Sequence, residues 1–414
     1  MTAQPLHVVI CSDNASINGG QAKVAIESAL SLKARGVEPI LFAAAGPVDP
    51  RLAEAGVEVV CLGQHELIGN PSRAAALLQG TWNFGAASAL KALLQRLPRS
   101  RTIVHVHAWA KALSPSIVQA IRASGAPALY TVHEYFLFCP NGGFYNYQAN
   151  HVCSLVPMSA ACLGSHCDQR NYVRKVWRFS RLALARSLAH MPEAFSDYIT
   201  ISDYQAEIVA PYLPRGARVH RLSNPVETLD PGLKEEPASG DFVFVGRLSP
   251  EKGPLLFAQA AARAGLRAVF VGDGPMAEEI RVRHPEAVLL GWLPAAEARE
   301  TLRRARALVF PSVWYEGQPL SVLEAKSMGT PVIVSDICAG RDEIEDGVDG
   351  LWFRSGDVEQ LARAMTRLAD DATVARFSRN AYESYWRRPP TADAHLEGLL
   401  AIYNEMLSRR RLAA

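Results

Sequence analysis

The sequence predicts an α/β protein made of two doubly wound, Rossmann-like domains that face each other across a cleft. Apolar runs of strand length alternate with helix-like segments along all 414 residues, a pattern typical of parallel sheets covered by helices. The runs are continuous rather than alternating, which suits strands buried on both faces. The chain is also about twice as long as one ordinary domain core requires.

The expected strands divide into two groups. Those of the first half are His7–Cys11, Pro39–Phe42, Thr102–His105, Ala128–Val132, Tyr198–Ile201 and Arg218–Leu222; those of the second half are Phe242–Val245, Ala268–Val271, Ala287–Leu290, Ala307–Phe310 and Pro331–Val334. A stretch rich in Pro, Gly and charge between them indicates a linker. We therefore expect an N-terminal domain over 1–225, a C-terminal domain over 226–388 and an amphipathic helix over 389–414.

Composition excludes several classes of protein. Hydrophobic residues make up 49%, charged residues 20%, and the formal net charge is only +2, so a globular enzyme is expected and nucleic acid is not an expected partner. The first apolar run, Leu6 to Ile10, is shorter than a signal peptide or a membrane span requires. Seven unevenly spaced cysteines argue against a disulfide framework. These features predict a reduced, cytoplasmic protein.

Two cations follow the first expected strand of the second half. Arg247 and Lys252 lie just after the run Phe242–Val245, and ligands of open α/β sheets bind beyond the carboxyl ends of the strands. A guanidinium fork and an ammonium would neutralise a diphosphate without a metal. The alternative is that both are solvated surface cations.

A second turn with the same architecture follows the run Ala307–Phe310. A helix is expected to begin near Pro319, because proline fits the first helical turn. The free backbone N–H groups of Gln318, Leu320 and Ser321 would face an anion. Pro319, which lies among them, has no N–H to donate. Glu316 and Glu324 flank this helix start and would accept hydrogen bonds from ribose or sugar hydroxyls, or would serve only as capping and surface groups.

These residues resemble the family 4 retaining glycosyltransferases of GT-B fold. Glu316-Gly-Gln-Pro-Leu-Ser-Val-Leu-Glu324 reproduces the E-x7-E signature of that family, and Val245-Gly-Arg-Leu-Ser-Pro-Glu-Lys-Gly253, Val271-Gly-Asp-Gly-Pro275 and Asp346-Gly-Val-Asp-Gly350 are similarly typical. The resemblance implies transfer of a sugar, with retention of configuration, from a UDP- or GDP-sugar to a glycan or lipid-linked acceptor in cell-surface polysaccharide assembly. It also implies that the C-terminal helix crosses back to the N-terminal domain.

The resemblance further assigns roles to the second-half residues. Arg247 and Lys252 would bind the donor diphosphate and stabilise the departing charge, with no cofactor required for catalysis. Glu324 would hold the ribose, and Glu316 the hydroxyls of the donor sugar. Backbone groups at Gln318, Pro319 and Leu320 would complete the cradle, with Pro319 replacing the commonest glycine of the family. Trp292 falls where the nucleobase packs in the family, or is a core aromatic.

In the first half, the resemblance extends to a glycine loop and a histidine. Gly19 and Gly20 follow the first strand and, without side chains, would let the backbone approach a phosphate or an acceptor; the alternative is an ordinary turn. His133 ends the strand Ala128–Val132 and matches the histidine beside the reacting sugar in the family. Without the resemblance, a structural histidine is the competing interpretation.

Two features lie outside the expected common core. An insertion over about 139–168 contains Cys139, Cys153, Cys162 and Cys167, which would form either a structural zinc site or a set of unligated thiols.

A helix over 170–191 follows this insertion. Basic residues at helical spacing and an apolar side suggest a peripheral contact with anionic lipid, or an ordinary helix with a solvated charged face. The basic residues are Arg170, Arg174, Lys175, Arg178, Arg181 and Arg186, and the apolar ones Val173, Trp177, Leu184 and Leu188.

Two other functions fit the predicted fold. A sugar-nucleotide epimerase or hydrolase would consume the donor without an acceptor. A non-catalytic nucleotide-sugar-binding protein would be expected to lack Arg247, Lys252 or Glu316, and all three are present. The fold alone would not distinguish these functions.

Overall fold

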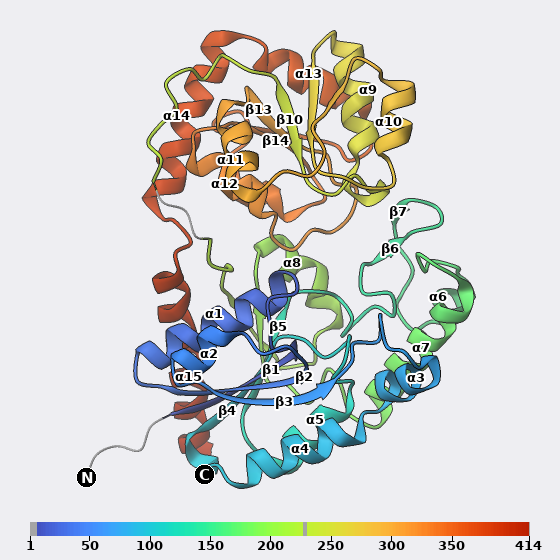
Figure 1. The fold of residues 1–414 in the computed structure, drawn as a ribbon, viewed down its shortest axis with the longest axis vertical. Helices are drawn as coiled ribbons and strands as arrows, with labels where there is room; N and C mark the ends of the chain where they lie inside the picture. The colour runs from blue at the N-terminus through green and yellow to red at the C-terminus, as the bar shows by residue number, and fades with distance from the viewer. Residues whose placement is uncertain (1–5, 227–229, 414) are drawn as a thin grey trace.

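The computed structural model describes residues 6–226 and 230–413, which form two α/β domains stacked along the long axis of the molecule (Figure 1). The expected domain limits at residues 1 and 414, and the linker residues 227–229, lie outside the described residues. Each domain contains one parallel sheet with helices on both faces, which confirms the predicted fold class.

The N-terminal domain contains a seven-stranded sheet of order β3-β2-β1-β4-β5-β8-β9, in which every pair is parallel. Its strands are β1 His7–Asn14, β2 Glu38–Ala45, β3 Glu58–Gln64, β4 Thr102–Val106, β5 Ala128–Val132, β8 Asp197–Thr200 and β9 Arg218–Arg221. In register, Val9 of β1 lies between Ile40 and Val104. The central strands are buried along their length, as continuous apolar runs predict.

Helices cover both faces of this sheet. They are α1 Gly20–Ala34, α2 Pro50–Glu54, α3 Arg73–Thr81, α4 Phe84–Gln95, α5 Ser116–Ser124, α6 Ala160–Gly164, α7 Tyr172–Ser187 and α8 Asp203–Val209. Residues of α4 and α5 pack on the face that contains Val9, whereas residues of α1 pack on the face that contains Val8 and Ile10. The hairpin of β6 Tyr145–Asn146 and β7 His151–Val152 belongs to the insertion and extends toward the C-terminal domain (Figure 1).

The C-terminal domain contains a six-stranded sheet of order β12-β11-β10-β13-β14-β15, again parallel throughout. Its strands are β10 Phe242–Val245, β11 Ala268–Val271, β12 Val288–Leu289, β13 Ala307–Phe310, β14 Val332–Ser335 and β15 Gly350–Phe353, and its helices are α9 Pro254–Ala264, α10 Ala277–Arg283, α11 Ala295–Arg304, α12 Leu320–Ser327, α13 Val358–Leu368 and α14 Asp371–Arg387. One face packs on α9, α13 and α14, and the other on α11 and α12.

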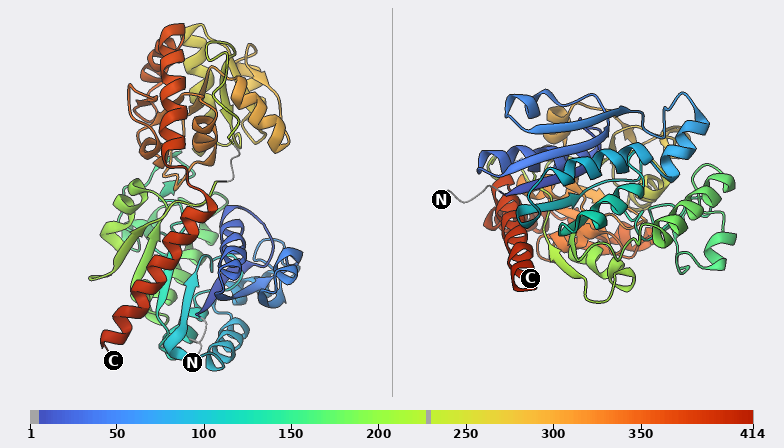
Figure 2. Two further views of the ribbon diagram at one scale, coloured as in Figure 1. Left: turned by 90° about the vertical axis from the view of Figure 1, so that its left-hand side faces the viewer. Right: turned by 90° about the horizontal axis from the view of Figure 1, so that it is seen from below.

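The last helix, α15 Ala392–Ala413, leaves the C-terminal domain and runs along the N-terminal one (Figure 2). Leu399, Tyr403 and Met406 are buried in the same core cluster as strand β1. Near the end of the helix, Arg409 donates to Asp197 of β8 at 2.5 Å. The prediction that this helix crosses back is therefore confirmed.

Candidate active site

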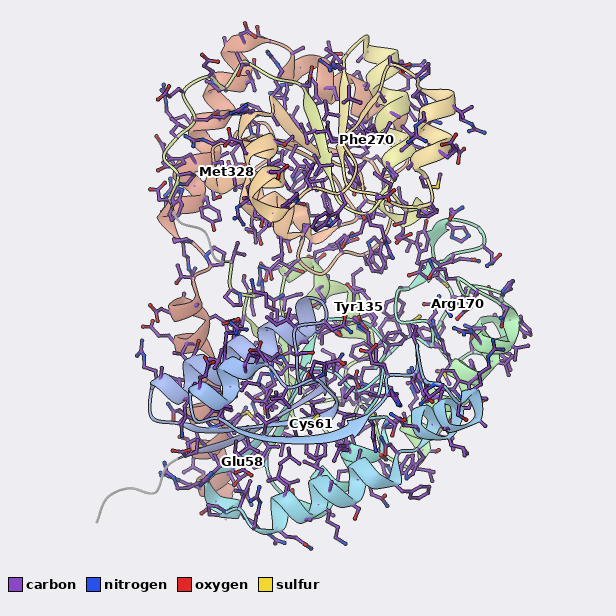
Figure 3. All side chains as sticks on the ribbon, in the orientation of Figure 1. Glu58, Cys61, Tyr135, Arg170, Phe270 and Met328 are labelled. Carbon is purple, nitrogen blue, oxygen red and sulfur yellow. The ribbon has the colours of Figure 1, made fainter. Side chains whose placement is uncertain are left out.

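The loops that follow the carboxyl ends of both sheets lie where the two domains meet (Figure 1). Tyr135 lies three residues beyond β5. Figure 3 shows it between the two sheets, where the domains meet. In parallel sheets these ends gather ligand-binding loops. The candidate residues of both domains come from such loops.

Arg247 lies two residues beyond β10 and is 61% exposed. Its Nη2 donates to Glu251 Oε1 at 2.6 Å, and the same oxygen accepts from Ser249 Oγ at 2.8 Å. Glu251 is buried, so it is a fixed anchor for a guanidinium whose other nitrogens face outward. This pairing orients Arg247 in the absence of a ligand.

Lys252 belongs to the same loop and pairs with Glu316, which follows β13. Glu316 Oε1 also accepts from Trp314 Nε1 at 2.6 Å and from Ser312 Oγ at 3.2 Å. The ammonium of Lys252 lies 5.7 Å from the Trp314 ring centroid, a cation–π distance. Three donors therefore converge on one carboxylate oxygen and fix the side chain of Glu316.

A glycine permits the two loops to meet. Gly253 has φ +68°, and a Cβ there would lie 2.2 Å from the carbonyl oxygen of Pro311. An L side chain would be strained by both the backbone conformation and the overlap. The close approach places Lys252 beside the loop that contains Glu316.

Helix α12 begins at Leu320, with Pro319 as its N-cap residue, which confirms the predicted helix start. Gln318 is turned toward the linker, since its Oε1 accepts from the backbone N–H of Asn224 at 2.8 Å. Leu320 is 44% exposed. Glu324 lies one turn into the helix, where burial raises the pKa of its carboxyl, and the charges of Arg299 and Lys23 oppose that rise.

The interaction of Glu324 with Lys23 spans the two domains, because Lys23 belongs to α1. The glycine loop immediately precedes that helix. Gly19 has φ +93°, and a Cβ added at Gly19 or Gly20 would meet no atom within 4 Å. The next residue, Gln21, is among the groups that lower the pKa of Glu134 beyond β5, although burial raises that pKa overall. The structure thus brings the glycine loop beside the end of β5, with open space over its backbone.

His133 is partly buried at the end of β5, and its Nε2 lies 3.0 Å from Nδ1 of His107. Burial, followed by the charge of His395, lowers the pKa of His133 to about 3. The imidazole is therefore neutral near pH 7, and it would act through hydrogen bonds and not as a cation.

The segment after β5 lies between the candidate residues of the N-terminal domain and those of the C-terminal domain. Burial raises the pKa of Tyr135, and the charge of Glu316 is one of the neighbouring charges that raise it further. The phenol of Tyr135 therefore lies within electrostatic range of the Glu316 carboxylate. Tyr147 of the insertion has its pKa raised to about 12 by burial and by Glu251, while Arg247 among others lowers it. The structure therefore brings Arg247, Lys252 and Glu316 together and places the insertion beside them.

Aromatic residues in and just before the insertion pack on one another and on the rest of the N-terminal domain. Tyr135, Phe144 and Tyr145 are buried, and Phe144 stacks on Tyr212 with ring centroids 5.2 Å apart. These three rings are therefore held by packing. Trp292 is different: it is 76% exposed, which excludes the core-aromatic interpretation.

The four cysteines of the insertion do not form a metal-binding set. Within residues 6–226 and 230–413, no three His, Cys, Asp or Glu side chains are grouped to hold a metal ion. Lys175 Nζ instead donates to Cys162 Sγ at 3.3 Å and to Cys167 Sγ at 3.2 Å. Cys139 Sγ donates to Asn141 Oδ1 at 3.1 Å. An ammonium thus lies between two thiols, and the arrangement does not fit the predicted zinc.

Helix α7 carries its basic residues differently from the prediction. Lys175 and Arg181 are buried, and Arg181 lies 4.9 Å from the Trp177 ring centroid. Arg178 pairs with buried Asp168 at 3.1 Å. Much of the cationic face is therefore turned inward, whereas Val173 is 78% exposed. None of the described helices is long and apolar enough to cross a bilayer.

A surface hollow of about 370 Å³ lies elsewhere, at the amino ends of β5, β8 and β9 beside α15. Arg122, Arg218, Arg409 and Arg410 are among its lining residues. It contains none of the candidate residues, and its position at the opposite edge of the sheet separates it from the loops described above.

Several partners in the site were missing from the sequence prediction. These are Glu251 for Arg247, Ser312 and Trp314 for Glu316, and His107 for His133. The first three lie within five residues of the group they contact. His107 follows β4, and its contact with His133 depends on β4 lying next to β5 in the sheet, which the structure reveals.

Two family models match the chain. Residues 18–228, more than half of the sequence, match the model described as Glycosyltransferase Family 4. Residues 239–371 match the model described as Glycosyl transferases group 1. Together the two matches include every strand of both sheets except β1, which ends at Asn14.

Curated proteins show similarity over part of the chain. UDP-Gal:alpha-D-GlcNAc-diphosphoundecaprenol alpha-1,3-galactosyltransferase of Escherichia coli is 33% identical over 163 residues, which cover 36% of this chain and 41% of the relative. Lipopolysaccharide 1,6-galactosyltransferase of the same species is 30% identical over 194 residues, 42% of this chain and 53% of the relative. The chain thus spans about half the length of these relatives, or less.

The crystal structure of HepE from Anabaena in complex with UDP and glucose resembles the whole fold. Its TM-score is 0.64 at 15% identity, with 97% of this chain and 100% of that chain covered. At this identity the likeness concerns the fold alone.

Proposed function

Because this chain belongs to glycosyltransferase family 4, we propose that it transfers a sugar from a nucleoside diphosphate donor to a glycan or lipid-linked acceptor, with retention of configuration. Its setting would be the assembly of a cell-surface polysaccharide. The observation that carries the proposal is the cluster of Arg247, Lys252 and Glu316 on adjoining loops. The relative that acts on a diphosphoundecaprenol-linked sugar supports the acceptor class.

The two cations act where charge develops during the reaction. As the bond between the sugar and the phosphate breaks, the sugar gains oxocarbenium character and the diphosphate gains negative charge. Arg247 and Lys252 meet that charge together with the N-terminus of α12 at Leu320. Their carboxylate partners, Glu251 and Glu316, hold them in place before the donor arrives, so little reorganisation accompanies the step.

The carboxylates recognise hydroxyl groups. Lys252, Trp314 and Ser312 all meet Oε1 of Glu316, which leaves Oε2 to accept from a hydroxyl of the donor sugar. Glu324, one turn into α12, accepts from the ribose. Trp292, exposed beyond β12, packs on the base. Gly19 and Gly20 approach the donor or the acceptor from the N-terminal domain.

The acceptor enters from the N-terminal domain, where the insertion adjoins His133. A lipid-linked acceptor requires contact with a membrane surface, and helix α7 exposes Val173, with exposed Arg170 just before the helix and exposed Leu188 just after it. Apolar insertion with a flanking cation suits the headgroup region of an anionic membrane.

The test begins with donor binding and ends with transfer. A panel of UDP- and GDP-sugars is screened for protection against thermal unfolding, because a ligand present at 100 times its Kd stabilises by about 2.7 kcal/mol. The best donor is then supplied with lipid-linked acceptors. We expect protection by one donor and turnover that depends on the acceptor, whereas Trp292→Ala should lower protection without changing the unfolding of the free protein.

Each alternative function gives a different result. Donor consumption without an acceptor would indicate an epimerase or hydrolase. Protection by a donor with no turnover on any acceptor would indicate a binding protein. The proposal is overturned if no nucleotide sugar protects the protein.

A further inference from the structure

Three histidine rings lie in a row at the carboxyl edge of the N-terminal sheet. His105 is on β4, His107 follows that strand, and His133 follows the adjacent β5. The ring centroids of His105 and His107 are 4.0 Å apart, and those of His107 and His133 are 5.3 Å apart. Only the last ring is partly exposed, because His105 and His107 are buried. The row therefore connects the core of the domain with the candidate active site.

The inner end of the row is held by hydroxyl groups. His105 Nδ1 lies 2.7 Å from Oη of Tyr403, and its Nε2 lies 2.7 Å from Oγ1 of Thr131. Tyr403 belongs to α15, the helix that returns from the C-terminal domain. Both ring nitrogens of His105 are thereby engaged, so this ring is a fixed surface against which the tilted ring of His107 packs.

The hydrogen bond between His107 and His133 joins two neutral rings. Burial is the first cause that lowers the pKa of each ring, and neighbouring histidines add to it. A hydrogen bond between neutral imidazoles needs a protonated nitrogen on one ring and a bare nitrogen on the other. The 3.0 Å contact between His107 Nδ1 and His133 Nε2 therefore couples the tautomers of the two residues.

The second nitrogen of His107 decides the direction of this bond. His107 Nε2 is buried and contacts no hydrogen-bond partner in the described part of the chain. If Nδ1 of His107 accepted the bond, the proton would reside on Nε2 and an N–H would be buried without an acceptor. Buried N–H groups of that kind are rarer in proteins than incompletely paired acceptors. The proton of His107 therefore belongs on Nδ1, where it has a partner.

We propose that His107 is a positioning residue that donates its Nδ1–H to Nε2 of His133 and so holds His133 as the Nδ1–H tautomer. Free histidine in water favours the Nε2–H form, so the pair selects the less common one. His133 then offers Nδ1–H as a hydrogen-bond donor to an oxygen of the sugar, and no charge change of the ring is needed. The role in catalysis rests on the proposed function, but the tautomer does not.

The tautomer is measured directly on the intact protein. Protein labelled with ¹⁵N only at histidine is recorded in long-range ¹H–¹⁵N correlation spectra, and the His133 signals are assigned by their loss in His133→Gln. We expect the shift pattern of an Nδ1–H ring in the ligand-free wild type. An Nε2–H ring at His133 in the wild-type protein would overturn the proposal. This result does not depend on the folding of a position-107 variant.

Variants at position 107 separate positioning from packing. His107→Leu removes the donor, whereas His107→Asn keeps an N–H close to the place of Nδ1. We expect His133 to move toward the Nε2–H form in the leucine variant and kcat to fall about tenfold, with KM for the donor changed less than about threefold. The asparagine variant should keep His133 in the Nδ1–H form, and its kcat should lie within about threefold of the wild-type value.

His7→Leu serves as the matched control, since His7 begins β1 at the opposite edge of the same sheet. It should leave the His133 signals and kcat unchanged. Equal losses in the leucine and asparagine variants, or an unchanged kcat once the tautomer has shifted, would overturn the positioning role. Failure of every donor to turn over would instead refute the proposed function and leave the tautomer measurement standing.

Discussion

Replacing Lys252 by alanine tests the centre of the proposed mechanism. The change removes an ammonium that pairs with Glu316 and lies 5.9 Å from the Phe310 ring centroid. The Lys252 side chain is only 23% exposed, so water does not replace its charge fully. Loss of one preorganised group at the developing charge typically costs about 3 kcal/mol, which corresponds to about a 100-fold fall in kcat.

The cost to folding should be much smaller than the cost to catalysis. Breaking a fully buried ion pair costs about 3–5 kcal/mol, but Glu316 retains the hydrogen bonds from Trp314 and Ser312. Partial exposure of Lys252 reduces the cost further, so we expect a destabilisation of about 1–2 kcal/mol. The variant should therefore fold at 25 °C, and its kinetics can be compared with those of the wild type.

The assay compares kcat at saturating donor and acceptor with the midpoint of thermal unfolding. Arg281→Ala is the matched control, because Arg281 also pairs with a glutamate but does so on the exposed surface of α10. Such pairs contribute about 0–1 kcal/mol, and kcat should not change. A Lys252→Ala protein that is folded and retains kcat within about threefold of the wild type would refute the electrostatic argument.

The remaining predictions concern stability. Although burial opposes it, hydrogen bonds from His220 and Arg409 hold the pKa of Asp197 at about 2, below its ordinary value of 3.8. The resulting stabilisation is complete above about pH 4 and is lost as the pH falls toward 2, so Arg409→Ala should flatten the acid limb of the free energy of unfolding by up to about 2 kcal/mol. Gly253→Ala should lower the free energy of unfolding in denaturant by clearly more than Gly265→Ala. Both glycines have φ near +65°, but only at Gly253 would a Cβ overlap a carbonyl oxygen; equal losses would contradict this reasoning.

The sequence predicted the central strands well because burial on both faces leaves a continuous apolar run. It did not predict β3, whose residues Glu58–Gln64 are half-buried at the sheet edge and include Gly63. Its apolar run Val59–Leu62 is as long as those of several predicted strands, so the pattern itself indicates a strand, and no physical feature of the sequence accounts for its omission. The short strand β15, Gly350–Phe353, was likewise recognised only as the end of a motif.

The candidate site divides in the same way. Arg247, Lys252 and Glu316 could be selected because each follows a predicted strand, and position along a strand is visible in sequence. The contact between His107 and His133 depends on β4 lying next to β5, which a single sequence does not specify.

Helix α7 shows a further limit of sequence periodicity. Its arginines recur at helical spacing, but Arg181 donates to the carbonyl of Ala110 at 2.8 Å and lies 5.3 Å from the Trp109 ring centroid. Those partners are about 70 residues away in the chain. Periodicity predicts which residues share a face, whereas tertiary packing decides which face is buried.

The insertion meets the C-terminal domain at one indole, that of Trp314. A Cβ at Gly143 would lie 3.5 Å from the ring of Trp314 and 3.3 Å from Oη of Tyr147, so the insertion already packs on the loop after β13. Trp314 in turn fixes Glu316 through its Nε1. A change in the insertion that displaces this indole would therefore move the carboxylate proposed to read the donor sugar. We therefore expect a large residue at Gly143 to displace this indole and to weaken donor recognition at the proposed site.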